Sequence, residues 1–395
     1  IYDGSWFQLP RVEDPVRSIG ETDFVYISHI HPDHYDPAFL RRYFEKHGEK
    51  LVLIADHQPN HLARKLAGDG FRFEIVDEFG HYEIGNTLLS IMPHKTGSAS
   101  DIDSALIVET TREGRRHCIV NANDIVFDDS TRRELKRRAG EVDILLCGYT
   151  GAGPFPQTYF DLDDPDLIVA ADQKKKSFFD RYKALVEVID AKINIPFAGK
   201  YLLGGKLVGL NDCRGVADPI EVLDFDDRAV VLADDGGYID TGELEPVGVR
   251  TVPYREPDKK KRLQEIAAYS MDYERLFNLE ESGQLPVRRL LALAARRAVA
   301  RSEVEGDYFY CFRLTGEILV VNANRHGDGS ITTFANNETL PSPRSEIRID
   351  IRYLFGLLTH VYHWNNAEVG SQFTVRRFPN QLNRAAQRFL NFLAV

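Results

Sequence analysis

Short apolar runs alternate with segments of helical periodicity through the first half of the chain. Polar or turn-forming residues bound each run, which is typical of buried strands. The expected strands are residues 24–27, 51–54, 71–76, 87–92 and 142–147, with two more beginning at residues 118 and 193. The expected helices are residues 37–47, 60–67, 125–138 and 174–189. Strands that alternate with helices in this way predict a layered α/β domain.

The pattern changes character near residue 255, so we expect a domain boundary there. Residues 1–250 would form the first domain and residues 255–395 a smaller C-terminal α/β domain. The expected strands of the second domain are residues 308–312, 318–321 and 347–351, and its helices are residues 285–300 and 353–362. This part resembles sterol-carrier-protein-like domains. Its cluster His-Trp-Asn-Asn at residues 363–366 either caps a pocket or seals a helix end, and we favour the helix end.

Length and charge limit the kinds of function. The 395 residues suffice for two domains with separate hydrophobic cores. Lys and Arg number 49 and Asp and Glu number 60, which gives a net charge of −11. This balance argues against nucleic-acid binding but allows a local basic pocket for an anionic small-molecule substrate.

Cysteine spacing and hydropathy favour a protein of the cytoplasm. The four cysteines lie far apart in the sequence, so we expect neither a zinc knuckle nor a disulfide framework. No apolar run is long enough to span a bilayer, and the first residues do not resemble a signal peptide. We therefore expect no membrane partner.

The strongest chemical signal is the sequence Tyr-Ile-Ser-His-Ile-His-Pro-Asp-His at residues 26–34. It contains four potential metal ligands directly after a predicted strand: His29, His31, Asp33 and His34. Imidazole and carboxylate donors suit zinc, iron or manganese. Alternation along an extended loop puts His29 and His31 on one side, where both could bind one metal. Asp33 and His34 would then hold a second metal or orient a bound water. A solvated histidine-rich turn is the alternative, which the position at a strand end disfavours.

This run resembles the signature of the metallo-β-lactamase superfamily, His-x-His-x-Asp-His at the end of a strand. The resemblance implies an αββα sandwich with a metal site, in which Asp33 serves catalysis by orienting or deprotonating a bound water. It further implies a third histidine ligand after a later strand, a place that His94 matches and for which Asp101 competes. Asp124 matches the carboxylate that bridges two metals. The alternative for Asp124 is the N-cap of the helix expected at residues 125–138.

Two later segments narrow the resemblance. Residues 149–157 and 196–201 are similar to loops of the cytidine monophosphate N-acetylneuraminate hydroxylase family, and the likeness covers a large part of the first domain. Tyr149, Lys200 and Tyr201 of these loops are the candidate substrate-binding residues. A lysine in such a loop is a local exception in an acidic chain, so we expect Lys200 to bind an anionic group.

Resemblance to that family implies an iron-dependent oxygenase acting on an anionic, nucleotide-sugar-like substrate. Members of the family carry a Rieske cluster, which needs two Cys and two His as ligands. No Cys-x-His or Cys-x-x-His pair occurs in this sequence, so we expect an external electron donor. The alternative is a hydrolase that cleaves a phosphodiester, lactone or amide through a metal-bound hydroxide. We expect one or two metal ions, with iron favoured over zinc or manganese.

The sequence also departs from the superfamily pattern. No histidine occurs between His117 and His326, so a second metal is either absent or held by Asp33, His34 and Asp124 with water. Only 28 residues precede the first motif histidine, fewer than the superfamily usually has, so the chain is either trimmed or lacks its first residues here. Those residues carry prolines and charges, and we expect them to form a loop.

Overall fold

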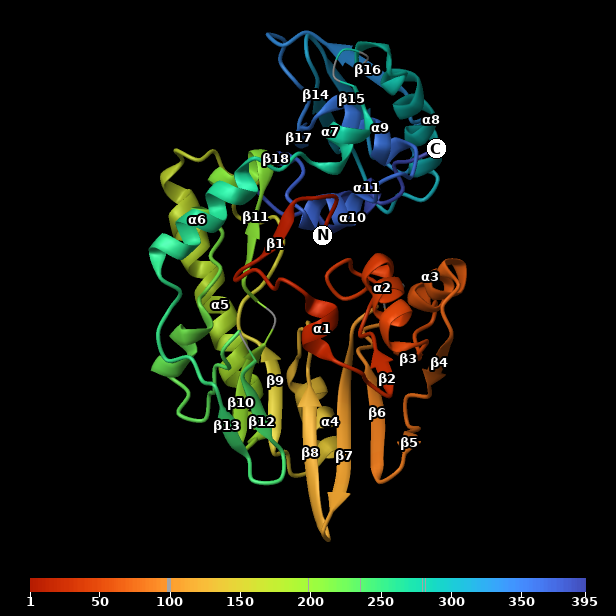
Figure 1. The fold of residues 1–395 in the computed structure, drawn as a ribbon. Helices are drawn as coiled ribbons and strands as arrows, with labels where there is room; N and C mark the ends of the chain where they lie inside the picture. Colours follow the sequence, from red (N-terminus) through yellow and green to blue (C-terminus); the bar gives the residue numbers. More distant parts are fainter. Residues whose placement is uncertain (98–100, 198, 235, 279, 281) are drawn as a thin grey trace.

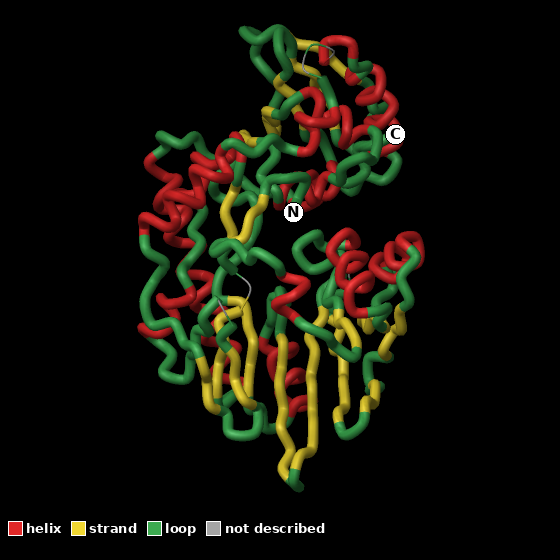
Figure 2. The backbone as a smooth tube through the Cα atoms, in the orientation of Figure 1, coloured by secondary structure: helices red, strands yellow, loops and turns green. Residues whose placement is uncertain are grey.

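Two sheets lie face to face in the lower part of the molecule, and a third sheet lies above them (Figures 1 and 2). The computed structural model describes residues 1–97, 101–197, 199–234, 236–278, 280 and 282–395. Ala198, in the candidate substrate loop at residues 196–201, lies outside these described residues.

The two lower sheets contain the strands expected in the first half of the chain. The first sheet is parallel and consists of β2 (Phe24–Tyr26), β3 (Leu51–Ala55) and β4 (Phe73–Val76). The second sheet has the order β10-β9-β8-β7-β6-β5, with β8, β9 and β10 parallel to one another. Its strands are β5 (Tyr82–Ile84), β6 (Thr87–Pro93), β7 (Ser104–Arg112), β8 (Arg115–Asn121), β9 (Ile144–Gly148) and β10 (Ile193–Phe197).

Alternation along β3 determines how the layers stack. Helices α2 (Pro37–His47) and α3 (His61–Asp69) share a buried core with Val52 and Ile54. Leu53 belongs to a different core, which it forms with residues of β6. Successive side chains of a strand point to opposite faces. The two helices therefore cover one face of the first sheet, and the second sheet covers the other face.

The far side of the second sheet is covered by α4 (Asp129–Ala139) and α5 (Pro165–Ile189). Leu135 of α4 and Tyr182 of α5 share a core with Val120 of β8. The resulting order of helix, sheet, sheet and helix is an αββα sandwich of the metallo-β-lactamase type. The fold class expected from the sequence is confirmed.

A mixed five-stranded sheet with the order β16-β15-β14-β17-β18 organises the C-terminal unit, which we define as residues 272–278, 280 and 282–395. Its strands are β14 (Phe309–Arg313), β15 (Ile318–Asn322), β16 (Ile331–Phe334), β17 (Arg344–Arg348) and β18 (Thr374–Phe378). Its helices are α7 (Asp272–Leu276), α8 (Val287–Val299), α9 (Ile351–Leu358), α10 (Trp364–Val369) and α11 (Arg384–Leu390), with the short 3₁₀ turn η3 (Ser282–Gln284). The domain boundary near residue 255 stays a prediction.

Between the sandwich and this unit the chain forms short elements. These are the 3₁₀ helices η1 (Gly205–Cys213) and η2 (Pro219–Asp224), the hairpin β12 (Tyr238–Asp240) and β13 (Glu245–Val247), and α6 (Glu256–Ala267). Among the described residues, no helix combines the length and apolar character needed to cross a bilayer.

The first residues of the chain are ordered, so the expectation that they form a loop was wrong. They contain β1 (Trp6–Gln8) and α1 (Pro15–Ile19), and β1 pairs antiparallel with β11 (Tyr201–Leu203). Tyr2 and Trp6 share a buried core with residues of the C-terminal unit. A three-residue strand whose partner lies far along the chain has no local pattern by which it could be predicted.

Candidate metal and substrate site

A tight turn after β2 gathers the motif residues. The carbonyl oxygen of His31 accepts hydrogen bonds from the backbone N–H groups of His34, at 2.9 Å, and Tyr35, at 2.8 Å. This turn brings His34 back beside His29, with ring centroids 4.0 Å apart. Residues that were expected to point in different directions therefore face one site.

Ser28 orients two of the histidine rings. Its Oγ lies 3.0 Å from Nδ1 of His29 and 3.0 Å from Nδ1 of His34. Ser28 is itself fixed, because its carbonyl oxygen accepts a hydrogen bond of 2.8 Å from Ser104 Oγ at the start of β7. With both Nδ1 atoms turned toward Ser28, both Nε2 atoms are left for the site.

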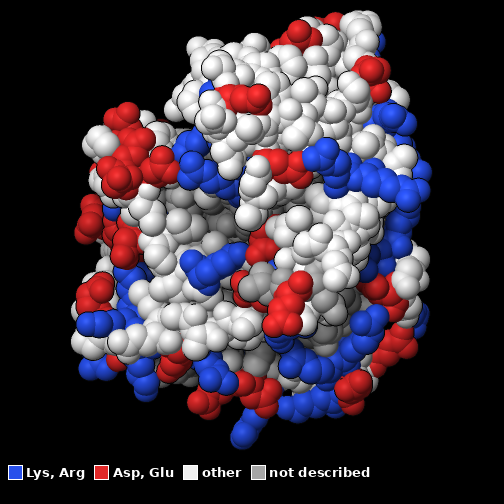
Figure 3. Space-filling view, turned by 90° about the horizontal axis from the view of Figure 1, so that it is seen from above, with Lys and Arg blue, Asp and Glu red and all other residues white. Residues whose placement is uncertain are grey.

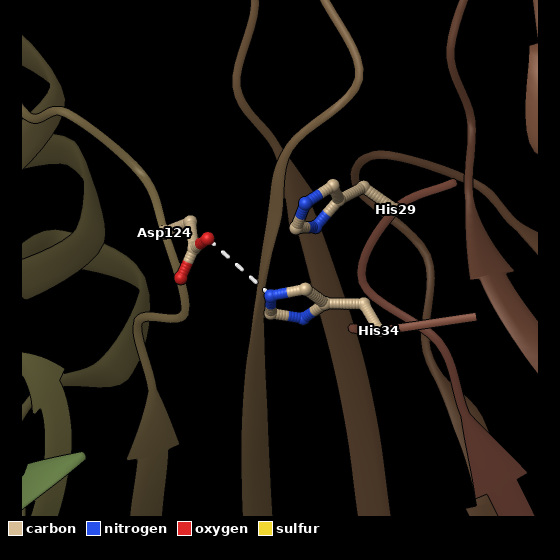
Figure 4. Close-up of side chains that lie close together, drawn as sticks. All are labelled: His29, His34 and Asp124. Atoms are coloured by element: carbon tan, nitrogen blue, oxygen red, sulfur yellow. Dashed lines mark ion pairs between the residues drawn. The ribbon is translucent and has the colours of Figure 1, made fainter. Parts of the chain in front are cut away.

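The ligand atoms of His29, His34 and Asp124 all lie within 4.8 Å of one another (Figure 4). Nε2 of His34 is 3.3 Å from Oδ2 of Asp124. Nδ1 of His31 lies 2.9 Å from Nε2 of His29, so His31 joins the group from the other side. Neutral imidazoles with a carboxylate form a donor set that fits iron, zinc or manganese.

Two further carboxylates border this group. Asp33 lies with Oδ2 3.6 Å from Nε2 of His34, and its Oδ1 accepts a hydrogen bond of 2.7 Å from the hydroxyl of Tyr2. Asp103 lies with Oδ1 3.6 Å from Nδ1 of His29. Asp103 was not expected from the sequence; the signal that could have identified it is a carboxylate directly before the apolar run that forms β7 (Ser104–Arg112).

His94 and Asp101, the two candidates for a third ligand position, differ in their hydrogen bonds. His94 follows β6, and its backbone N–H donates to the carbonyl of Asp103 at 2.8 Å, while its ring is not part of the group of three. Asp101 accepts hydrogen bonds from the N–H and hydroxyl of Thr96, each at 2.6 Å, and from the N–H of Gly97 at 3.0 Å. The carboxylate of Asp101 therefore stabilises the loop that contains Thr96 and Gly97. A ligand role for His94 stays a prediction.

Asp124 is not a helix cap, so that alternative was wrong. Helix α4 begins at Asp129, and its N-cap is Asp128, whose carboxylate accepts a hydrogen bond of 2.7 Å from the N–H of Thr131. Asp124 instead follows β8 and turns its carboxylate to His34. The structure leaves it available for the bridging role, which stays a prediction.

Electrostatics favour neutral imidazole at the buried end of the site. Burial, and then the neighbouring His34 and His31, lower the pKa of His29 to about 2. Burial alone would lower the pKa of His34, but the hydrogen bond and charge of Asp124 raise it above the ordinary value. Burial and the nearby Asp124 raise the pKa of Asp103. A cation placed among these groups would relieve the repulsion between the carboxylates.

The site opens into a cavity of about 540 Å³. His31, Asp33, His34, Asp103 and Asp124 form part of its wall, and residues of the two predicted substrate loops form another part. Seen from above, the molecule is hollowed near the centre of its face, with basic and acidic side chains at the border (Figure 3).

Lys200 and Tyr201 both line this cavity. The ammonium group of Lys200 pairs with Asp218, which also receives Arg250 at 3.3 Å. Two cations therefore share one carboxylate. Tyr149 is buried, at 2 % exposure, and is not among the residues that form the cavity wall, but its ring lies against Gly199, the neighbour of Lys200. A role for Tyr149 in substrate binding stays a prediction.

A second basic residue on the wall, Arg181 of α5, was missed from the sequence. Its guanidinium lies 5.0 Å from the ring centroid of Phe178, which also lines the cavity. Within the described part of the chain, no acidic side chain forms an ion pair with it. The apolar spacing of this helix predicted its buried face but gave no sign that Arg181 would reach a cavity.

Comparison with known proteins supports the relationships expected from the sequence. The chain is 30 % identical over 239 residues to a protein of Mycolicibacterium smegmatis named for a Rieske 2Fe-2S iron–sulfur centre, covering 58 % of this chain and 44 % of that protein. It is 28 % identical over 204 residues to the cytidine monophosphate-N-acetylneuraminic acid hydroxylase of Danio rerio, covering 50 % of this chain and 33 % of that enzyme. The chain thus spans half or less of the length of these relatives. No family model matches it.

Among solved structures, the chain aligns with CmlA, a diiron β-hydroxylase from Streptomyces venezuelae, with a TM-score of 0.34 and 16 % sequence identity. The alignment covers 50 % of this chain and 38 % of that chain. The stacking of the layers and the His-x-His-x-Asp-His motif at the end of β2, rather than this alignment, identify the fold as metallo-β-lactamase-like.

Proposed function

We propose that this chain is a metal-dependent oxygenase that hydroxylates an anionic small molecule, with iron as its metal. The observation that carries the proposal is the grouping of His29, His34 and Asp124 within 4.8 Å beside a cavity of about 540 Å³. Two histidines and one carboxylate are typical of non-haem iron(II) oxygenases, and with His31 as a fourth ligand octahedral iron would still have positions open for dioxygen. The sequence similarity to hydroxylases over half the chain favours the same class of reaction.

The motif residues would hold the metal and orient the groups around it. Bound iron would supply the binding and reduction of dioxygen. His29, His31, His34 and Asp124 would be its ligands, with His29 kept neutral by burial. Asp33, held by Tyr2, would accept or return a proton at the wall of the cavity.

The other end of the cavity would bind the substrate. Arg181 and Lys200 would attract its anionic group, and Lys200 shares Asp218 with a second cation, which leaves net positive charge there. The apolar wall contributed by Phe127, Phe178 and Phe197 would exclude water from the reacting carbon. A nucleotide sugar, with phosphate at one end and a sugar at the other, has the required distribution of charge.

Electrons would have to be supplied from outside these 395 residues. Hydroxylation with one dioxygen consumes two electrons and two protons, and this sequence contains no Cys-x-His or Cys-x-x-His pair. Several relatives are named for a Rieske centre. We propose an iron–sulfur centre of the Rieske type as the donor.

A metal-dependent hydrolase is the second candidate. It is favoured by Asp33, whose carboxylate is fixed by the Tyr2 hydroxyl beside His34 and opens onto the cavity. A carboxylate in this position could deprotonate a water whose pKa a metal has lowered to about 7.

Metal analysis followed by turnover separates the two candidates. Protein purified without added metal is analysed for iron, zinc and manganese, and then incubated with cytidine monophosphate-N-acetylneuraminic acid and a reducing system, with and without oxygen. We expect iron, and a product heavier by one oxygen atom only when oxygen is present; the His29→Ala protein should give neither. Zinc together with oxygen-independent cleavage of a phosphodiester or lactone would contradict the oxygenase and support the hydrolase.

A further inference from the structure

The C-terminal unit contacts the motif loop directly. Asn365 of α10 presents its Oδ1 2.9 Å from Nε2 of His31, across 334 positions of the sequence. Helix α10 is firmly anchored, because the neighbouring Trp364 is buried and its Nε1 donates to the carbonyl of Leu393 at 2.8 Å. Asn365 therefore holds a defined position relative to the loop.

This contact determines which nitrogen of His31 is free. An amide oxygen can only accept a hydrogen bond, so with Oδ1 of Asn365 facing the ring, the matching tautomer of His31 carries its proton on Nε2. Nδ1 then keeps its lone pair, and it lies 2.9 Å from Nε2 of His29, on the side of the metal group. Histidines that bind metals almost always donate their other N–H to a fixed acceptor, which sets the tautomer and the ring orientation.

We propose that Asn365 is a positioning residue of the metal site, so that the C-terminal unit completes a site whose ligands come from the αββα sandwich. The proposal rests on the proposed role of His31 as a metal ligand. A second set of contacts also connects the C-terminal unit to the motif. Gln372 donates to the carbonyl of Tyr2 at 3.1 Å, and the hydroxyl of Tyr2 donates to Asp33 at 2.7 Å. Two motif side chains are thus oriented by groups that the C-terminal unit supplies or holds.

Cobalt(II) titration of the metal-free chain tests this role without any turnover, because the visible absorption of bound cobalt reports its ligands. Asn365→Ala should weaken cobalt affinity about 10- to 100-fold and change the visible band. Asn365→Asp, which still accepts the hydrogen bond, should bind within a few-fold of the wild type. Asn366→Ala is the matched control: it is half-buried on the same helix, and its side chain makes no hydrogen bond with the described residues. Asn365→Thr, whose hydroxyl is too short to reach His31, replaces the alanine variant if that does not fold.

Three results would overturn the proposal. If Asn365→Ala binds cobalt like the wild type while His31→Ala does not, the metal site stands and Asn365 has no role in it. Equal losses of affinity in Asn365→Ala and Asn366→Ala, with equally lowered melting temperatures, would reveal general damage to α10 instead of positioning. If the wild type binds no cobalt, the proposed metal site and the proposed role of Asn365 are both refuted.

Discussion

The indole ring of Trp6 stacks on the ring of Tyr201, with centroids 3.6 Å apart and planes inclined by 15°. The guanidinium of Arg214 lies 4.2 Å from the centroid of the same Tyr201 ring. Trp6 and Tyr201 come from the paired strands β1 and β11, and both line the cavity. One wall of the candidate substrate site is therefore made by the first residues of the chain.

We expect Trp6→Ala to lower the free energy of unfolding by about 3–5 kcal/mol, because it removes a large buried ring. Tyr201→Phe should leave stability unchanged, since the Tyr201 hydroxyl is buried without a hydrogen-bond partner among the described residues. Denaturant unfolding measures both. If this hydroxyl contacts substrate, Tyr201→Phe raises KM at constant stability; a clear loss of stability would contradict our account of the wall.

His29→Ala and His31→Ala should each abolish tight binding of the first metal, because their facing nitrogens, 2.9 Å apart, would share it. Elemental analysis after gel filtration is the measurement. His326→Ala is the control, since this histidine is exposed and lies far from the motif in the sequence. Near-stoichiometric metal in both motif variants would refute the assignment.

Asp124 and Asp128 make a matched pair for separating metal binding from helix capping. If Asp124 bridges two metals, Asp124→Asn should lose the second metal and weaken the first, with little change in melting, because a neutral amide cannot offset the repulsion between two cations. Asp128→Ala should lower stability through the lost N-cap bond to Thr131 and leave metal content unchanged. Full metal content and activity in Asp124→Asn would remove the central residue of the site.

Arg181→Ala should weaken the binding of an anionic substrate and flatten its dependence on salt, because this guanidinium lines the cavity without an acidic partner in the described structure. Lys200→Ala should have the smaller effect, because the charge of Lys200 is already paired with Asp218 and Arg250 remains beside that carboxylate in the variant. Binding titrations at two salt concentrations measure both. Lys176→Ala, an exposed lysine of the same helix α5, serves as the control. Unchanged affinity and salt dependence in both cavity variants would exclude charge recognition by these residues.

Acid stability should depend on Asp143. Burial raises the pKa of this carboxyl, but its bonds with Lys192 at 2.6 Å and the N–H of Cys118 at 2.8 Å prevail and hold the pKa below the ordinary value of 3.8. Its contribution is therefore fully present above pH 3.8 and is lost as pH falls through the lowered pKa of the folded chain. Urea unfolding between pH 5 and about pH 3 should show a steeper loss for the wild type than for Asp143→Asn. Parallel profiles would contradict this role; Asp172→Asn, at an exposed position of α5, is the control.

The sequence predicted the sandwich well because its layers follow local patterns. The apolar run that became β3 was recognisable, although only the structure separates Val52 and Leu53 into two cores. The helix expected at residues 174–189 in fact begins at Pro165. The sequence did not predict this earlier start, because the first turns are partly polar and only the cap at Asp164 marks it.

The site was predictable only where its residues are adjacent in sequence. The motif was clear, but Asp103 and Arg181 reach the site through folding. The cluster at residues 363–366 was interpreted as sealing a helix end, and His363 does accept the N–H of Asn365 at 3.3 Å. Its neighbour Asn365 nevertheless turns its side chain to His31, a contact for which the sequence contains no signal.

The bond between His31 and Asn365 also has a consequence for the time at which the site can form. The motif leaves the ribosome when most of the chain, including α10, has not yet been synthesised. Closing so long a loop costs chain entropy, so this contact forms late in folding. Metal loading of a correctly oriented His31 would therefore wait until α10 has been synthesised and has reached the motif loop.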